Sequence, residues 1–407
     1  MRIIKKKIVI LGAGIEQLEA YKISKKLGLV VIGVEKNSNA PALEIADYKI
    51  NISIKNTDTI IAELKKYYPI HGVFTLASDF PVSVSKIAKK FKIKAIPIKS
   101  ALNASNKILM KKKFKKFKIN TPKFYIIKNF TEFRKRIKKF NQNIIIKPSD
   151  NCGSRGVFLL NKNYNYKKLK YYFEKSLKFS SEKKILLETF LEGPQISTEG
   201  LFIKNKYKSI CFADRNYSGL HKTKPFILED GGSIPSAINK KMQNSIDYLI
   251  NKACDALNIN QGTIKGDLVI FKNKPYIIEL AARISGGYMA THSIPLIYNF
   301  NFLERAIKQA CDIPVSDKLN LKPKKKFLCQ RYFFCENKYL SKIKGIKYLR
   351  KNKNIKYFEI YAKPGQKLKK VQSHAERSGM IIALDNSYKL AQKKAEDAIK
   401  KIKFIYQ

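Results

Sequence analysis

The chain has 407 residues, enough for about two or three domains, and 44% of them are hydrophobic, which excludes a globally disordered protein. Its 82 Lys and Arg residues outnumber 31 Asp and Glu residues and give a formal net charge of +51. This positive charge is nearly all lysine and is spread along the chain, whereas nucleic-acid readers usually gather arginine and aromatic residues on one module. We therefore expect no specific nucleic-acid partner.

The sequence predicts neither a signal peptide nor a membrane-spanning segment. The basic start, Met1 to Lys7, precedes an apolar run that is too short for a signal peptide, and no apolar run reaches the length of a membrane span. The six cysteines show neither CxxC nor zinc spacing, so we interpret them as reduced thiols of a cytoplasmic protein. The lysine runs Lys111 to Lys113 and Lys322 to Lys326 are predicted to be solvated faces or linkers.

The first predicted domain, residues 1–99, alternates short apolar strands with helical periodicity, which is typical of a parallel sheet. Gly12 and Gly14 follow the first strand and, with Glu35, resemble half of a dinucleotide-binding fingerprint. Gln17 stands where its third glycine would be. We favour a Rossmann-like turn that binds no nicotinamide. Strands are expected at 8–11, 29–34, 49–52 and 72–76, and helices at 16–27 and 57–68.

A second domain is predicted for residues 100–316, and it opens with one lysine-studded helix over 100–117. Its two hairpins are expected to turn near Asn205 and Asn273. A linker over 317–326 leads into a small last domain, 317–407, with short strands and a closing helix over 386–402. The other expected strands are 124–127, 144–147, 157–160 and 185–189, and the other helices are 131–140, 166–177 and 242–257.

A soft loop, Ser149 to Gly156, separates two apolar strands and follows Lys147 directly. Its glycines and serines allow backbone N–H groups to wrap around phosphates. The same composition also suits a plain hairpin turn, so this loop alone does not decide between the two.

Two acids, Asp267 and Glu279, lie on the two strands of the second predicted hairpin. Carboxylates on paired strands can face one another, and they repel unless a cation lies between them. Magnesium binds such carboxylate oxygens together with phosphate oxygens. The alternative is two solvated surface acids. The apolar neighbours of Glu279 favour a buried acid that needs a partner.

Taken in order, these motifs resemble the ATP-grasp superfamily over nearly the full chain. The resemblance implies a mixed α/β and α+β fold: a Rossmann-like N-terminal domain, a central ATP-grasp fold with a lid at about 122–190, and a small C-terminal α+β domain. The tail, from Arg331 onward, is similar to the small C-terminal domain of the carboxylase-like and amino-acid-ligase-like branches. The chain as a whole resembles a carbamoyl-phosphate-synthase-like or L-amino-acid-ligase-like carboxylate–amine ligase of this superfamily.

The resemblance also implies roles for residues that match the motifs. Lys147 and Arg283 are expected to be catalytic, with Arg283 steadying an acyl phosphate. Asp267 and Glu279 are expected to hold Mg²⁺ or Mn²⁺, although Ala281 stands where a third ligand, an Asn, is frequent. The expected ATP-binding residues are Lys107, Lys147, Ser154, Arg155, Gly156, Glu188, Thr189, Phe190, Leu191 and Gln195.

The implied activity is that of an ATP-dependent ligase, which activates a carboxylate as an acyl phosphate and joins it to an amine. Its expected partners are small-molecule carboxylate and amine substrates, and no membrane association is expected. The oligomeric state stays open, with a homodimer as one possibility. One alternative is a purine-biosynthesis or biotin-carboxylase-like enzyme that uses formate or bicarbonate, and another is a non-catalytic nucleotide- or polyanion-binding protein. The substrate contacts expected from their place in the chain are Arg215, His221, Ser285, Gly286 and His292.

Overall fold

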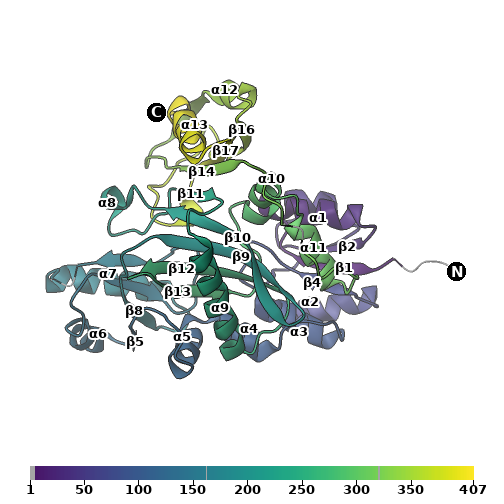
Figure 1. The fold of residues 1–407 in the computed structure, drawn as a ribbon, viewed down its shortest axis with the longest axis horizontal. Helices are drawn as coiled ribbons and strands as arrows, with labels where there is room; N and C mark the ends of the chain where they lie inside the picture. Colours follow the sequence, from purple (N-terminus) through teal and green to yellow (C-terminus); the bar gives the residue numbers. More distant parts are fainter. Residues whose placement is uncertain (1–4, 162, 320) are drawn as a thin grey trace.

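The computed structural model describes residues 5–161, 163–319 and 321–407. The predicted basic start and the predicted linker at 317–326 therefore lie partly outside the described residues. Figure 1 shows three parts: an N-terminal part in purple, a central part in blue to green, and a C-terminal part above it in light green and yellow. The predicted fold class is confirmed.

The N-terminal part is a four-stranded parallel sheet with the order β3-β2-β1-β4. The two central strands, β1 and β2, are rich in Val and Ile and are almost wholly buried because helices cover both faces, whereas the edge strand β3 exposes Tyr48 and Lys49. The strands are β1 (Lys7–Leu11), β2 (Val30–Val34), β3 (Tyr48–Ile50) and β4 (Gly72–Phe74). The helices are α1 (Leu18–Lys26), α2 (Thr57–Leu64) and α3 (Pro81–Lys90), of which α3 was not predicted.

The single helix predicted over 100–117 is wrong, because the structure has two helices, α4 (Ile98–Ser105) and α5 (Lys107–Lys116). Asn106 adopts an extended backbone between them, and its side chain accepts hydrogen bonds from the N–H groups of Ile108 and Leu109. An Asn in this position ends one helix and caps the next. Lys107 is therefore the first residue of α5.

A lid subdomain follows, with a four-stranded antiparallel sheet in the order β5-β8-β6-β7. As predicted, β6 and β7 pair across the soft loop. Two amphipathic helices pack their aromatic side chains, among them Phe133 and Phe173, against the sheet. The elements are β5 (Phe124–Ile127), α6 (Phe130–Ile137), β6 (Ile144–Pro148), β7 (Phe158–Leu160), α7 (Tyr166–Lys178) and β8 (Ile185–Thr189).

An eight-stranded sheet runs through the central and C-terminal parts in the order β13-β12-β9-β10-β11-β14-β17-β16. The two predicted hairpins, β9–β10 and β12–β13, are confirmed as neighbours within it. Its strands are β9 (Gln195–Ile203), β10 (Lys206–Asn216), β11 (Gly231–Ile234), β12 (Thr263–Phe271), β13 (Lys274–Ala281), β14 (Phe327–Phe333), β16 (Ile355–Ile360) and β17 (Gly379–Asp385).

Helix α9 (Lys240–Leu257) packs its apolar face on this sheet, and α11 (Phe302–Ala310) returns to pack beside α1 and β4 of the N-terminal part (Figure 1). No helix of the described residues is both long and apolar enough to cross a membrane. The remaining elements are α8 (Leu220–Thr223), α10 (Ile294–Ile297), β15 (Leu340–Lys344), α12 (Ile346–Lys351), α13 (Tyr388–Lys401) and β18 (Lys403–Tyr406).

Candidate active site

A cavity of about 700 Å³ lies where the lid, the large sheet, the turn after β1 and a C-terminal loop meet. Gly156, His221 and His292 do not line it, and His221 is exposed on α8. The predicted residues that do line the cavity are Lys107, Lys147, Ser154, Arg155, Glu188, Thr189, Phe190, Leu191, Gln195, Arg215, Asp267, Glu279, Arg283, Ser285 and Gly286.

One end of the cavity is built around the buried carboxylate of Glu188, at the end of β8. Lys147 of β6 places Nζ 2.8 Å from Glu188 Oε2, and Lys111 of α5 places Nζ 3.4 Å from Oε1. Burial opposes a charge on Glu188, but the two ammonium groups outweigh it and lower the pKa of the carboxyl. The pair of lysines therefore keeps Glu188 ionised.

Lys111 was predicted to be solvated, and this prediction is wrong. Its side chain is 1% exposed, whereas Lys112 beside it is exposed. Lys111 follows Lys107 by four residues, so both lie on the same face of α5, toward the cavity. The ammonium group of Lys111 also donates to Thr121 Oγ1 and to the Ile277 carbonyl. Burial lowers the pKa of Lys111 to about 8, although Glu188 acts in the opposite direction.

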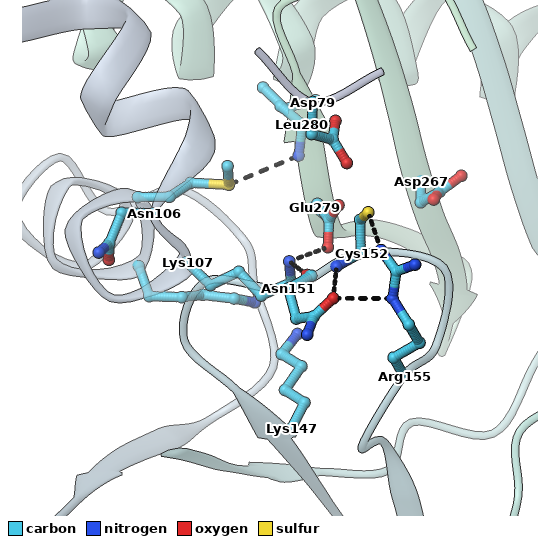
Figure 2. A network of polar contacts seen from close by, with 12 residues as sticks. Asp79, Asn106, Lys107, Lys147, Asn151, Cys152, Arg155, Asp267, Glu279 and Leu280 are labelled. Atoms are coloured by element: carbon cyan, nitrogen blue, oxygen red, sulfur yellow. Dashed lines mark hydrogen bonds and ion pairs between the residues drawn. The ribbon is translucent and has the colours of Figure 1, made fainter. Parts of the chain in front are cut away.

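Lys107 joins α5 to the lid loop and to the hairpin. Its Nζ donates to the Asn151 carbonyl at 2.6 Å and lies 3.2 Å from Glu279 Oε2. Figure 2 shows how the loop folds back at this point: Arg155 donates to the Asn151 side chain and to Cys152 Sγ, both at 2.9 Å. The soft loop is thus an ordered flap over the cavity rather than a two-residue hairpin turn.

A loop of the C-terminal part holds this flap in place. The His374 N–H donates to the Gly153 carbonyl at 3.0 Å, and His374 Nε2 lies 3.3 Å from Ser154 Oγ. The same Nε2 accepts from the Glu229 N–H at 3.2 Å, which requires a neutral imidazole. Burial lowers the pKa of His374 well below its ordinary value, in agreement with that state.

The carboxylates of Asp267 and Glu279 come from residues directly paired across β12 and β13. Arg215 NH1 lies 3.4 Å from Asp267 Oδ1, and Lys265 also pairs with this carboxylate. Burial opposes the charge on Asp267, yet Arg215 and Lys265 together hold its pKa well below the usual range. The described residues contain no group of three or more His, Cys, Asp or Glu side chains that could hold a metal.

This donor set nevertheless fits Mg²⁺. The ion is usually bound by one or two carboxylates, and substrate phosphates and water complete its coordination. Asp267 and Glu279 line one wall of the cavity, and both carboxylates already lie beside cationic groups. Mg²⁺ would replace Lys107, Arg215 and Lys265 as the partner of these oxygens. Two carboxylates are as many as the ion needs when a triphosphate is also bound.

Arg283 follows β13 and connects the hairpin to the N-terminal part. Next to it, Ile284 pairs with Leu76 at the end of the β4 segment. Arg283 Nε lies 2.6 Å from Asp79 Oδ1, an acid that sequence reasoning missed. Burial opposes the charge on Asp79, but Arg283 outweighs it and lowers the pKa of Asp79 to about 2. The guanidinium is thereby held at the cavity wall.

The loop after Arg283 rests on two further acids: Glu199, which the sequence suggested as a partner for hydroxyl groups, and Glu16, which the sequence did not single out. The Ser285 N–H donates to Glu199 Oε1 of β9 at 2.8 Å, and burial raises the pKa of Glu199 to about 7. The Gly287 N–H donates to the carboxylate of Glu16 at 3.2 Å. Only the three-dimensional pairing of the N-terminal part with this loop reveals these contacts, because Glu16 lies 271 residues away from Gly287.

Comparisons with known proteins agree with this geometry. An ATP-grasp domain model matches residues 104–287, and a model of the L-amino acid ligase C-terminal domain 2 matches residues 331–407. The formate-dependent phosphoribosylglycinamide formyltransferase of Prochlorococcus marinus (strain MIT 9515) is 24% identical over 99% of both chains. The crystal structure of L-amino acid ligase from Bacillus licheniformis is 20% identical with a TM-score of 0.83 over 99% of both chains. Phosphoribosylglycinamide synthetase from Anaerococcus prevotii has a TM-score of 0.74 at 21% identity, over 99% of this chain and 100% of that one.

The fold and the matched domains define the class of protein: the chain belongs to the ATP-grasp superfamily. Within that class it is an ATP-dependent ligase of the carboxylate–amine kind, as the resemblance implied. The predicted family and the predicted reaction type are therefore confirmed. The individual site residues and the domain boundaries stay predictions.

Proposed function

We propose that the cavity binds Mg-ATP with the adenine beside Glu188 and the triphosphate beneath the flap. Thr189, Phe190 and Leu191 line the wall next to Glu188, and their backbone supplies groups for a base edge. Gln195 lies at the start of β9, where its amide suits the ribose hydroxyls. Lys107 and Lys147 supply positive charge for the phosphates, and the N–H groups of Ser154 and Arg155 belong to the flap above them.

Asp267 and Glu279 are the residues that would hold Mg²⁺. When bound, the ion supplies positive charge that offsets the gathering negative charge of the phosphoryl group. Lys107 bridges Glu279 and the flap, so it couples closure of the flap to this wall of the cavity.

The reaction we propose takes place in two steps. A carboxylate oxygen attacks the γ-phosphorus, the bond to the bridging oxygen breaks, ADP leaves and an acyl phosphate forms. An amine then displaces phosphate to form the C–N bond. Arg215 and Arg283 lie on the walls next to the hairpin, where guanidinium groups can pair with the acid and then with the developing oxyanion. The flap, closed by the His374 contacts, excludes water that would hydrolyse the acyl phosphate.

The single observation that carries this proposal is that one cavity joins the two sets of residues. The nucleotide set, around Glu188, and the arginines that suit a carboxylate, Arg215 and Arg283, line the same space. A cavity of about 700 Å³ has room for small ligands of this kind. The acid and the amine are small molecules in this proposal.

A second candidate has formate as the acid and a phosphoribosylated amine as its partner. The observation in its favour is the full-length match to the formate-dependent formyltransferases. A phosphate group on the amine needs free cationic side chains at the far end of the cavity. Arg377 is the arginine there, and it already donates to the Glu229 carbonyl at 2.5 Å and stacks 3.6 Å from the Tyr332 ring centroid. A phosphate on the amine would compete with these contacts for the Arg377 guanidinium.

Phosphate release from Mg-ATP tests the proposal. The assay combines formate, bicarbonate and each amino acid as acids with amino acids, glycinamide and phosphoribosylglycinamide as amines. We expect release that requires one acid and one amine together. Glu279→Gln should fold as the wild type does, and its turnover should fall at least about 100-fold because a magnesium ligand is lost. Normal product formation by this variant, or release without any organic partner, would contradict the assignment.

A further inference from the structure

One carboxylate of the cavity is not accounted for by the nucleotide or by an ion pair. Glu16 forms no ion pair with any residue that the structure describes, and the hydrogen bond that its carboxylate accepts comes from the Gly287 N–H. Asp214, also on the wall, is hydrogen-bonded on both oxygens by Ser236 and Ala237. The cavity acids that are in ion pairs are Glu188, Glu229, Asp267 and Glu279.

Glu16 lies in the turn after β1 and faces the loop that follows Arg283. A Cβ atom built on Gly286 would lie 2.5 Å from Glu16 Oε2, so only glycine allows the carboxylate to approach this loop so closely. A Cβ atom on the next residue, Gly287, would lie 2.9 Å from the Tyr332 hydroxyl. Glu16 and Tyr332 therefore flank one short stretch of loop, three to four residues beyond Arg283.

The surroundings of Glu16 suit a positive ligand. Burial raises the pKa of the Glu16 carboxyl, while the Gly287 N–H and the more distant Arg283 and Arg377 act against this shift. A desolvated carboxylate without an ammonium or guanidinium partner is costly unless a cation arrives with the ligand. The aromatic ring of Tyr361 also lines the cavity, and the face of such a ring attracts cations. The ring of Tyr332 already has the Arg377 guanidinium 3.6 Å from its centroid.

We infer that Glu16 binds the ammonium group of the amine substrate and takes one of its protons. This inference rests on the proposed function. As the amine forms, one ammonium proton passes to the Glu16 carboxylate. The amine nitrogen then attacks the acyl carbon, the bond from that carbon to the phosphate oxygen breaks, and the phosphate leaves with that electron pair and the second proton. The amine partner is accordingly a primary amine that is cationic at neutral pH.

Hydroxylamine provides a matched neutral nucleophile. It is uncharged near neutral pH, so it needs neither an anion to bind it nor a base to activate it, and it traps an acyl phosphate as a hydroxamate. The experiment compares hydroxamate formation with amide formation by the full chain, with Mg-ATP and the acid that gives product with the wild type. The amine probes are glycine, L-alanine and glycinamide. The test variant is Glu16→Gln, whose amide oxygen can still accept from Gly287.

We expect Glu16→Gln to lose about 100-fold in kcat/KM for the amine, the effect of removing one partner of a desolvated charge pair. Its hydroxamate formation and its KM for ATP should stay within about threefold of the wild type. Glu19→Gln is the control, because Glu19 pairs with Lys22 on α1 outside the cavity and should change neither reaction.

Two results would overturn the inference. If Glu16→Gln forms the amide at the wild-type rate, Glu16 does not bind or deprotonate the amine. If amide and hydroxamate formation fall equally, Glu16 only supports the loop. If the wild type forms neither hydroxamate nor amide with any acid, the ligase assignment itself fails and the inference fails with it. The hydroxamate reaction of the wild type thus separates the two proposals.

Discussion

Replacing Lys111 by methionine should stabilise the protein and weaken its hold on ATP. Lys111 is a fully buried lysine with a carboxylate partner at 3.4 Å, in a cluster that contains two ammonium groups and one carboxylate. Methionine has a similar length, and it removes one charge from the cluster while Lys147 and Glu188 stay paired at 2.8 Å. The change therefore separates what Lys111 costs in folding from what it contributes to binding.

The magnitude follows from the pKa of Lys111, which burial lowers from 10.5 to about 8. A difference of this size corresponds to about 3 kcal/mol against the charged lysine. Methionine loses the hydrogen bonds to Thr121 and Ile277, which together contribute about 1 kcal/mol. We expect a net gain of about 2 kcal/mol in the free energy of unfolding at pH 7.

The sign of the pH dependence is fixed because the folded-state pKa is the lower one. Below about pH 8 the lysine is charged in both states and the penalty is complete. It fades as the pH rises from about 8 toward 10.5, because the folded state releases its proton first. Urea unfolding near pH 7 and near pH 10 should show an advantage of Lys111→Met that shrinks at the higher pH.

The same variant should raise the KM for ATP at least about tenfold, because Glu188 loses its second cation when the phosphates recruit Lys147. Lys112→Met, on the exposed face of α5, is the matched control and should change neither property. The reasoning would be refuted if the Lys111→Met protein were less stable than the wild type at pH 7. It would also be refuted if the difference in the free energy of unfolding were the same at both pH values.

Two further predictions concern the loop supports. Glu199→Gln should be more stable than the wild type by up to about 3 kcal/mol near pH 8, because the pKa of Glu199 is raised from 4.5 to about 7 and the charged form is the costly one. The advantage should vanish near pH 4.5 in the same unfolding measurement, and an equal difference at both pH values would contradict it. Gly156→Ala should disturb the flap, because its φ is +73° and the new Cβ would lie 2.8 Å from Phe179. We expect the KM for ATP to rise about tenfold, and an unchanged KM would argue against a flap that needs this turn.

Much of the framework was predictable because it depends on local patterns. Alternating apolar runs and helical periodicity predicted the parallel sheet and the two hairpins, and the turn residues Asn205 and Asn273 adopt positive φ as such turns require. The distance of twelve residues between Asp267 and Glu279 placed them opposite each other because the hairpin between them is short.

The rest depends on contacts between distant segments. Glu16 reaches the cavity, and Asp79 reaches Arg283 on its wall, where Leu76 pairs with Ile284. No periodicity in the chain predicts that pairing. Lys111 was wrongly predicted to be solvated because the chain contains many solvated lysines, and the sequence does not distinguish the buried one from them. The break at Asn106 was missed because helical periodicity continues across it, while its side-chain cap is a single-residue signal.

The eight-stranded sheet has a consequence for how this enzyme can be divided. Strand β11 pairs with β14, so the boundary predicted near residue 317 crosses a continuous ladder of backbone hydrogen bonds. A fragment that stops before Phe327 would leave β11 as an open edge, free to pair with any extended segment that it meets. Grafting the last eighty residues of a relative onto this chain would have to preserve the register between Gly231 and Arg331. The C-terminal part thus supplies the last three strands of one sheet, β14, β17 and β16. Exchange of this part between relatives is constrained at a junction that looks like a linker in the sequence.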